Sequence, residues 1–219
     1  MQQDNQPAIR IADIQSSVLR PFTQTELKSV LSTLKDIGKE EPHVANLLAQ
    51  DSVLKNFIAD AFTLSPYLRE AAMADRGLLT LALESDLSQL LPTLLQDARD
   101  AWKPSSDGQE VSEADLMSRL RIAKRRLSFL VALADLARLF TAKETTAWLS
   151  HMADASLAAA IDFLLCTTHQ SGKIRLKDLD APSEGSGLVV LGMGKLGARE
   201  LNYSSDIDAV VFFEPSAGI

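Results

Sequence analysis

The sequence predicts a mainly helical leader that is followed by the start of an α/β domain. Leucine and alanine are abundant whereas aromatic residues make up only 5% of the chain, which favours helices packed through aliphatic side chains. Apolar residues recur at helical spacing through the first part of the chain, and short β-branched runs come only near its end. We therefore expect a helical region over residues 1–170, a linker over 171–187 and an incomplete α/β domain over 188–219.

Capping signals and helical spacing predict where the helices of the leader lie. Thr23 opens the first one with Glu26 three residues on, as in a capping box, and Gly38 ends it. Ser65 before Pro66 marks another start, with serine as the N-cap and proline in the first turn. The remaining apolar spacing predicts helices over residues 44–62, 66–76, 87–102 and 144–169, and a long helix from a cap at Ser112 to about residue 140.

Local chemistry adds three details to the longer helices. Pro92 has no backbone N–H to donate, so the helix around it is expected to start or kink there. Ser112 with Asp115 should cap the long helix that follows a loop over residues 103–110. The connection between the last two helices is short, which predicts an antiparallel hairpin.

Composition narrows the classes of function. The formal net charge is −7, which argues against a nonspecific nucleic-acid binder because such proteins usually present a basic face. A single cysteine, Cys166, excludes an internal disulfide, and a cytoplasmic location fits. The sequence shows no signal-peptide pattern and no uninterrupted apolar run of the roughly 18 residues that a membrane helix needs. We expect neither nucleic acid nor a membrane among the partners.

An acidic pair opens the last apolar run. Asp206 and Asp208 flank Ile207 at the start of an expected strand over residues 207–213. Since side chains i and i+2 of a strand project to one face, both carboxylates should point the same way, with Ile207 buried on the other. Mg²⁺ prefers oxygen ligands and commonly shares its shell with substrate phosphates, so the pair predicts a magnesium site. A solvated turn is the alternative for an isolated Asp-x-Asp.

A glycine-rich turn precedes the acidic pair. It follows an apolar run over residues 188–191, which we interpret as a buried strand. Glycines leave backbone N–H groups open to a phosphate, and serines just before the carboxylates add donors. The expected phosphate-binding residues are Gly192, Gly194, Lys195, Gly197, Ser204 and Ser205. Tight packing alone would also explain such a turn.

Two widespread phosphate motifs fit this turn less well. Leu196, instead of serine or threonine, follows Lys195, so the turn is not a Walker P-loop. Gly192, Gly194 and Gly197 match the spacing of a dinucleotide-binding turn, which is the second interpretation. That motif requires a helix of several turns and then a strand with an acid at its end. Here the next strand comes much sooner and opens with the acidic pair.

The string GMGKLGARELNYSSDID, residues 192–208, closely resembles the signature of the glutamine synthetase adenylyltransferase/adenylyl-removing family, within the DNA polymerase β-like nucleotidyltransferases. SPYL at residues 65–68 and LRIAKRR at residues 120–126 resemble that family's helical leader more loosely. The resemblance implies that residues 188–219 begin a nucleotidyltransferase domain whose metal-binding, catalytic pair is Asp206 and Asp208. It also aligns Gly194 and Lys195 with the family's glycine turn.

The first half of that family's enzyme removes AMP from a tyrosine of glutamine synthetase by phosphorolysis, releasing ADP, and the second half adds AMP from ATP. A helical leader before the first motif resembles the first half. The resemblance thus implies glutamine synthetase as protein substrate, ATP, ADP and phosphate as small ligands, Mg²⁺ as cofactor and a PII-type signal protein as a further partner. Ala198 stands where glycine is common. The third carboxylate of the superfamily lies on a later strand, so we expect this chain alone to be inactive.

Two other functions stay open. A helical protein-interaction module with a vestigial nucleotidyltransferase motif would account for the long leader. A different nucleotidyltransferase, acting on a small molecule or RNA, would share the motif, although the acidic charge disfavours RNA and the leader disfavours a minimal enzyme. A basic cluster is either a solvated helix face or a contact for phosphate or a partner protein; its members are Arg119, Arg121, Lys124, Arg125 and Arg126.

Overall fold

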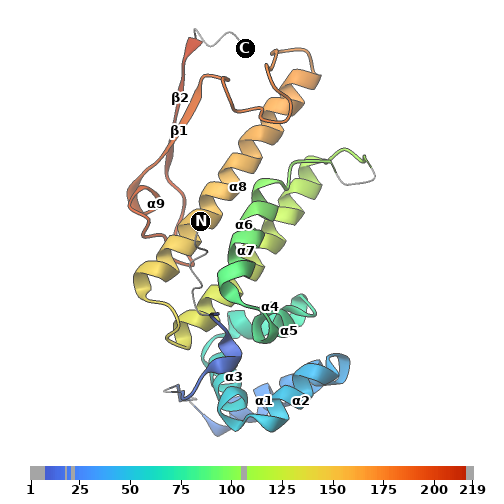
Figure 1. Ribbon diagram of the computed structural model, residues 1–219, viewed down its shortest axis with the longest axis vertical. Helices are drawn as coiled ribbons and strands as arrows, with labels where there is room; N and C mark the ends of the chain where they lie inside the picture. The colour runs from blue at the N-terminus through green and yellow to red at the C-terminus, as the bar shows by residue number, and fades with distance from the viewer. Residues whose placement is uncertain (1–7, 18, 21–22, 105–107, 216–219) are drawn as a thin grey trace, which may run out of the picture. The chain divides into compact units, whose positions relative to one another are not determined.

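A computed structural model describes residues 8–17, 19–20, 23–104 and 108–215 (Figure 1). The chain divides by its contacts into two units. Unit 1 comprises Met1–Pro92 and Ser128–Thr145, and unit 2 comprises Thr93–Leu127 and Thr146–Ile219. This division follows spatial contacts, whereas the division expected at residues 170 and 188 follows composition and stays a prediction.

The described residues are mainly helical, with a two-stranded sheet after the last long helix. The elements of unit 1 alone are η1 (Ile11–Asp13), α1 (Gln24–Glu40), α2 (Pro42–Gln50), α3 (Ser52–Leu64), α4 (Pro66–Ala74) and α5 (Leu78–Glu84). The helices that contribute residues to both units are α6 (Leu87–Arg99), α7 (Glu113–Leu136) and α8 (Ala142–Gln170). Unit 2 adds β1 (Leu188–Gly192), α9 (Gly194–Gly197) and β2 (Ala209–Phe213). The predicted fold class is confirmed.

Two predicted capping signals form as expected. The Thr23 side chain accepts the backbone N–H of Glu26 at 3.2 Å and donates to the Glu26 carboxylate at 2.8 Å. Ser65 accepts the N–H of Leu68 in the first turn of α4. The bonds to the N–H groups of Glu26 and Leu68 each satisfy a donor that a helix start leaves without an intrahelical partner.

The boundaries of the first helices differ from the prediction. α1 passes through Gly38, because this glycine lies against α2: an added Cβ would be 2.9 Å from Cβ of Ala45. Close packing, and not helix termination, explains the glycine. The segment 44–62 is split between α2 and α3, because Asp51 accepts two backbone N–H groups and so caps a new helix. The sequence analysis missed this N-cap.

Two longer helices also differ at their ends. α6 begins at Leu87 and runs through Pro92, so the helix does not start at the proline. Asp86, just before it, accepts the N–H of Ser88 at 3.0 Å and thereby caps the start. α7 ends at Leu136, before the predicted end at residue 140. Two residues later, Arg138 has a positive φ of 59°, which does not continue a helix.

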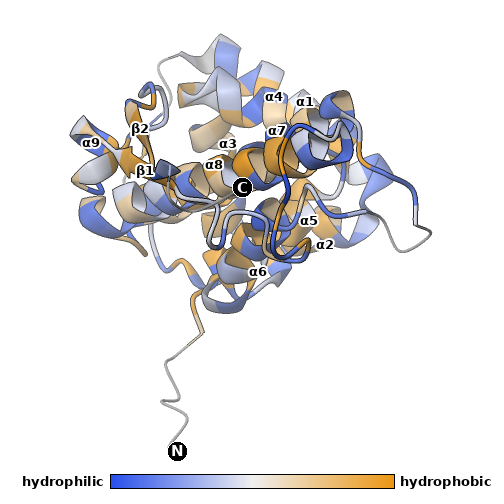
Figure 2. Ribbon diagram, turned by 90° about the horizontal axis from the view of Figure 1, so that it is seen from above, coloured by the Kyte–Doolittle hydropathy of each residue, from blue (hydrophilic) through white to orange (hydrophobic). Residues whose placement is uncertain are grey.

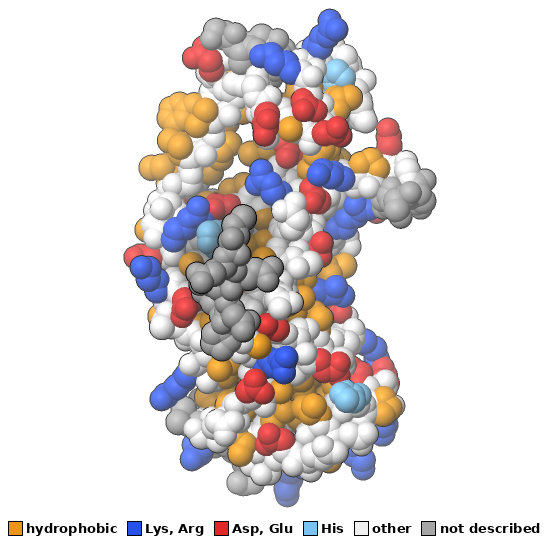
Figure 3. Space-filling view, in the orientation of Figure 1, with side chains coloured by type: hydrophobic (Ala, Val, Ile, Leu, Met, Phe, Trp, Pro, Cys, Tyr) orange, Lys and Arg blue, Asp and Glu red, His pale blue; other side chains and the backbone are white. Residues whose placement is uncertain are grey.

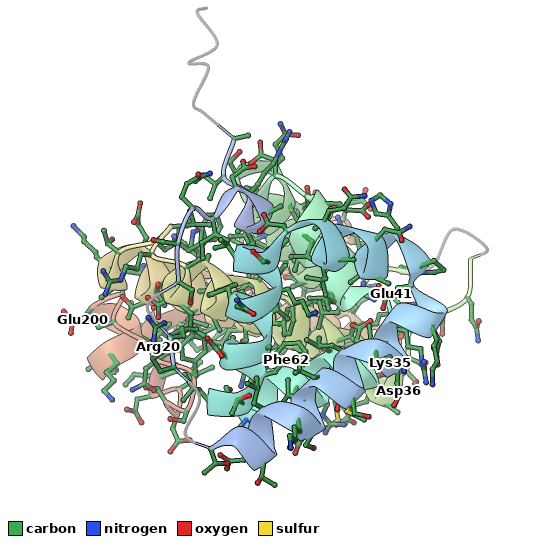
Figure 4. All side chains as sticks on the ribbon, turned by 90° about the horizontal axis from the view of Figure 1, so that it is seen from below. Arg20, Lys35, Asp36, Glu41, Phe62 and Glu200 are labelled. Carbon is green, nitrogen blue, oxygen red and sulfur yellow. The ribbon has the colours of Figure 1, made fainter. Side chains whose placement is uncertain are left out.

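The core of unit 1 is mostly aliphatic with a small aromatic centre. Phe57, Phe62 and Phe129 are fully buried. The rings of Phe62 and Phe129 meet edge to face, with centroids 6.3 Å apart and an interplanar angle of 62°; Phe62 is labelled in Figure 4. Such pairs add about 0.5–1.5 kcal/mol beyond the burial of their area. Contact between α3 and α7 therefore stabilises this unit.

Unit 2 contains its own small core. Its buried residues are Ala101, Trp102, Leu116 and Ala159. Leu116 lies near the start of α7 and Ala159 lies in the second half of α8, as the predicted antiparallel hairpin requires.

The segment after α8, expected to be a linker, is fastened to that helix. Leu176 donates its N–H to Nδ1 of His169 at 3.2 Å. Ser183 donates its N–H to the buried carboxylate of Asp162 at 3.1 Å. These bonds fix the path of the chain from the end of α8 to the first strand.

β1 and β2 pair antiparallel, in register from Leu188 opposite Phe213 to Gly192 opposite Ala209. Both strands are hydrophobic in sequence (Figure 2). The prediction of a buried first strand is nevertheless wrong for this chain, because Val189 is 51% exposed. Every residue of β2 is exposed as well. A two-stranded sheet has too few neighbours to cover its apolar side chains.

Candidate metal and phosphate site

The acidic pair lies in a loop at the entrance to the second strand. Asp206, Ile207 and Asp208 precede β2, which begins at Ala209, and both carboxylates are exposed. Ile207 is 43% exposed, so the prediction that it is buried opposite the carboxylates is wrong for this chain. The physical reason is that ladder pairing ends with Gly192 opposite Ala209, so strand alternation does not reach these three residues.

Asp208 lies against the glycine turn. Met193 donates its backbone N–H to the carbonyl of Asp208 at 2.8 Å, one step beyond the ladder. An added Cβ on Gly194 would be 3.6 Å from Oδ2 of Asp208. Gly194 also has a φ of +53°, a backbone conformation that glycine adopts at low cost. The turn and one carboxylate of the pair, predicted separately from the sequence, therefore meet in the structure.

The other two glycines of the turn have packing roles. An added Cβ on Gly197 would be 2.4 Å from the carbonyl oxygen of Gly192. One on Gly192 would be 2.8 Å from Cγ of Leu196, which is buried. Tight packing, the alternative considered for this turn, thus accounts for Gly192 and Gly197. Gly194 is the member that faces the acidic pair.

The start of α9 presents backbone donors beside Asp208. The first N–H groups of a helix have no partner within the helix. Met193, the N-cap residue, makes no side-chain cap bond, and Lys195 in the first turn is exposed. Backbone amide groups beside a carboxylate form an arrangement that can take the oxygens of a phosphate held jointly with a cation.

The two serines before the acidic pair lie in a turn around Asn202. Ser205 donates its hydroxyl to Oδ1 of Asn202 at 2.7 Å and accepts the Asn202 N–H at 3.3 Å. Ser204 donates its backbone N–H to the same oxygen at 3.2 Å. The Ser205 hydroxyl is therefore engaged within the loop, whereas Ser204 is exposed. A phosphate-binding role for either serine stays a prediction.

Two residues of α8 that the sequence analysis did not single out hold the same loop. Leu201 donates its N–H to Oγ of Ser150 at 3.3 Å, and Ser150 is fully buried. Arg199 forms an ion pair with Asp154. A signal was present in the sequence, because polar residues four apart in an Ala- and Leu-rich helix lie on one face. Their partners could not be read from that spacing.

The donor set at this site fits a magnesium-type cation. Asp206 and Asp208 can supply carboxylate oxygens. No group of three or more His, Cys, Asp or Glu side chains that could hold a metal occurs in the described residues, this site included. Mg²⁺ is usually held by one or two carboxylates while substrate phosphates and water complete its shell. A carboxylate pair beside a turn with free amides meets that requirement.

The basic cluster on α7 is partly structural. Arg119 donates to the carbonyl oxygens of Ala101 and Lys103, each at 3.1 Å. These bonds give hydrogen-bond donors to carbonyl groups just after the end of α6. Arg121 and Lys124 are exposed. Positive and negative side chains are interspersed over the face drawn in Figure 3.

α8 is long and apolar enough to cross a membrane by length and composition, the one such helix in the described ranges. Of the residues in its most apolar window, 44% are buried inside the protein. Core helices of soluble proteins also meet this criterion of length and composition.

Comparison with known proteins gives consistent matches. The model of the glutamate-ammonia ligase adenylyltransferase family matches residues 55–219. A bifunctional glutamine synthetase adenylyltransferase/adenylyl-removing enzyme of Agrobacterium fabrum is 71% identical over 96% of this chain and 21% of that protein. Proteins of the same description from Rhizobium meliloti and Mesorhizobium japonicum are 50% and 41% identical over 95% and 91% of this chain. The chain spans about a fifth of the length of these relatives. No solved structure matches it significantly.

Proposed function

This chain belongs to the glutamate-ammonia ligase adenylyltransferase family, and we propose that it forms the first part of an enzyme that removes AMP from adenylylated glutamine synthetase. The reaction is phosphorolysis: an oxygen of inorganic phosphate bonds to the phosphorus of AMP, the bond from that phosphorus to the tyrosine oxygen breaks, and ADP leaves. A second half of the complete enzyme, outside this sequence, adenylylates glutamine synthetase with ATP. The two reactions together regulate nitrogen assimilation.

The contact between Asp208 and the glycine turn supports this proposal most directly. Oδ2 of Asp208 lies 3.6 Å from where a Cβ of Gly194 would be. A carboxylate on one side and open amides on the other suit a phosphate that shares a cation with the protein.

Each residue of the site has a distinct task in this proposal. Asp206 and Asp208 hold Mg²⁺, which when bound neutralises phosphate charge and stabilises the leaving tyrosine oxygen. The amides of Gly194 and Lys195 orient the non-bridging phosphate oxygens, and the Lys195 ammonium adds positive charge next to them. Ser204 offers a further donor from the loop. Neither aspartate is needed as a general base for the attacking phosphate, because inorganic phosphate is already an anion at neutral pH.

The proposal extends to partners and location. Glutamine synthetase is the protein substrate, phosphate and ADP are the small ligands of this half, and ATP is the ligand of the other. A PII-type signal protein is a regulatory partner, and neither nucleic acid nor a membrane is part of the proposal. A cytoplasmic location agrees with the free thiol of Cys166.

A helical protein-interaction module is the second candidate. It is favoured by the helical structure of the described residues before the sheet. In that case residues 1–170 would bind a partner protein with unchanged affinity whether or not nucleotide is present. Nucleotide-dependent binding would favour the enzyme.

The decisive experiment replaces one carboxylate in the complete protein. Asp206→Asn keeps the size of the side chain and removes its charge, so phosphorolysis of adenylylated glutamine synthetase should fall more than about 100-fold, the upper range seen for residues that merely support a metal ligand. Glu200→Gln is the matched control, because Glu200 is an exposed acid of the same loop (Figure 4). Unchanged ADP release by the Asp206 variant would sink the proposal.

A further inference from the structure

The loop between the glycine turn and the acidic pair is attached to α8 at two positions one helical turn apart. Ser150 and Asp154 are four residues apart on this helix, so both lie on one face. Leu201 and Arg199 of the loop bond to them.

The Ser150 contact is buried. Ser150 donates its hydroxyl to the carbonyl of Thr146 at 2.8 Å and accepts the N–H of Leu201 at 3.3 Å. Ser150 is fully buried and Leu201 is 6% exposed. A buried N–H without an acceptor is costly, so the serine hydroxyl fixes the position of the Leu201 backbone. Alanine at position 150 would leave that N–H without its partner.

The Asp154 contact restrains an unusual backbone conformation. Arg199 has a φ of +61°, which few residues other than glycine, asparagine and aspartate adopt readily. Its guanidinium pairs with Asp154, and both side chains are about half exposed, at 49% and 41%. The ion pair therefore holds the loop in a conformation that the backbone alone disfavours.

Ser150 and Asp154, called the anchor residues below, are only a few residues of loop away from the acidic pair. Leu201 is followed by the turn in which Asn202 bonds Ser204 and Ser205, and Asp206 comes next in the chain. At the other end Met193 bonds the carbonyl of Asp208. The loop is thus held at both ends, by α8 on one side and by the glycine turn on the other.

We propose that Ser150 and Asp154 are positioning residues for the Asp206–Asp208 pair, holding the carboxylates where they can share one cation. The inference rests on the proposed metal site and names residues that act through the loop without touching the cation. Neither residue lies in the motif that carries the family resemblance.

The test uses Ser150→Ala and Asp154→Asn in the complete protein. Ser156→Ala is the matched control for the serine, because Ser156 makes the same bond to the carbonyl four residues earlier, at 2.8 Å, and none to the loop. Glu200→Gln is the control for loss of a negative charge. Amide hydrogen exchange over residues 199–208 and Mn²⁺ titration followed by electron paramagnetic resonance give readouts that do not depend on activity.

The two anchor variants should exchange faster over residues 199–208 and bind Mn²⁺ about three- to tenfold more weakly, the equilibrium effect of one lost hydrogen bond. The Mg²⁺ concentration for half-maximal phosphorolysis should rise by the same factor while the rate at saturating Mg²⁺ is largely kept. The control variants should match the parent protein in all three measurements. Loss of thermal stability with unchanged Mn²⁺ affinity would show a merely structural role and overturn the inference.

A double variant with exchanged charges provides a test that can still be interpreted if the single variants fold poorly. Asp154→Arg with Arg199→Asp restores the pair in reverse, and aspartate tolerates the positive φ at position 199 better than most residues. Restored Mn²⁺ affinity in the double variant supports positioning, and its failure to exceed either single variant opposes it. Asp206→Asn run in parallel separates the two proposals: if it leaves phosphorolysis unchanged, the proposed function fails, whereas normal Mn²⁺ binding by the anchor variants defeats only the positioning.

Discussion

Gly194 and Asp208 face one another across the turn that joins α9 to the sheet, with Oδ2 of Asp208 3.6 Å from the point where a Cβ on Gly194 would lie. The neighbouring bond from the Met193 N–H to the Asp208 carbonyl, at 2.8 Å, keeps the two segments at this separation. The pairing of β1 with β2 therefore positions Asp208 beside the glycine turn. Substitutions that keep this pairing can distinguish residues needed for packing from residues needed for ligand binding.

Gly194→Ala tests the contact with the acidic pair. A left-handed backbone costs a residue with a Cβ roughly 1–2 kcal/mol, so the free energy of unfolding should fall by about that amount. Gly185→Ala is the matched control, because Gly185 also has a positive φ, +67°, and its added Cβ would meet only the Lys177 side chain. Both variants should lose similar stability in denaturant titrations. Only Gly194→Ala should weaken Mn²⁺ binding; equal binding losses would contradict the assignment.

Gly197→Ala tests the packing role of the turn. The added Cβ would lie 2.4 Å from the Gly192 carbonyl oxygen, so the backbone must move and about 1–3 kcal/mol of stability should be lost. Ala198→Gly, at the next residue, should change stability by less than about 1 kcal/mol. Thermal unfolding with hydrogen exchange over the β1–α9 segment checks both. A fully tolerated alanine at position 197 would show that the turn is looser than described.

Asp60 should make stability depend on pH with a sign opposite to that of most carboxylates. Burial raises the pKa of Asp60, and the charge of Arg20 only partly opposes this. The folded chain therefore binds this proton more readily, and stability falls as pH rises from the ordinary carboxyl pKa through the raised one. Asp60→Asn should increase the free energy of unfolding at neutral pH, and the gain should vanish at a pH below the ordinary value.

Asp36→Asn is the opposite-sign control for that measurement. A hydrogen bond and the charge of Lys39 lower the pKa of Asp36, so its contribution is present above the ordinary carboxyl pKa and is lost as pH falls through the lowered one. The asparagine variant should be slightly less stable at neutral pH and equal to the parent at low pH. Denaturant titrations at neutral and acid pH measure both variants. A gain for Asp60→Asn that does not change with pH would contradict the burial argument.

Arg119→Ala separates the structural from the ligand-binding interpretation of the basic cluster. Its bonds to the carbonyls of Ala101 and Lys103 predict a loss of about 1–3 kcal/mol, since hydrogen bonds from charged donors are stronger than neutral ones. Arg121→Ala, at an exposed position of the same helix, should change stability by no more than about 0.5 kcal/mol. Comparable losses in chemical denaturation would argue against the capping role of Arg119.

Val211→Lys should reduce self-association of this chain. Val211 is 60% exposed on an open apolar sheet, and such strands pair with other chains. Leu179→Lys is the control, because Leu179 is similarly exposed, at 55%, but lies in the segment between α8 and the sheet. Light scattering over a concentration series should show less association for the strand variant alone. Equal improvement in both would point to net charge as the cause.

The sequence analysis was most accurate where the physics is local. Thr23 with Glu26 and Ser65 with Pro66 predicted helix starts that the structure confirms, because an N-cap depends only on the next few residues. It failed at Gly38, where a residue that often ends helices instead permits close contact with α2. No local signal distinguishes those two uses of glycine.

The same division applies to the site. Residue identity and spacing alone determined that two carboxylates, Asp206 and Asp208, follow a glycine turn near the end of a helical chain. Only the tertiary structure decided that Asp208 faces Gly194, that Ile207 is exposed, and that Ser150 and Asp154 hold the loop. Capping and helical periodicity depend on residues that are close in sequence, so they can be recognised from the sequence alone. Strand register and helix-to-loop contacts join residues distant in sequence, and their free energy exists only after the chain has folded.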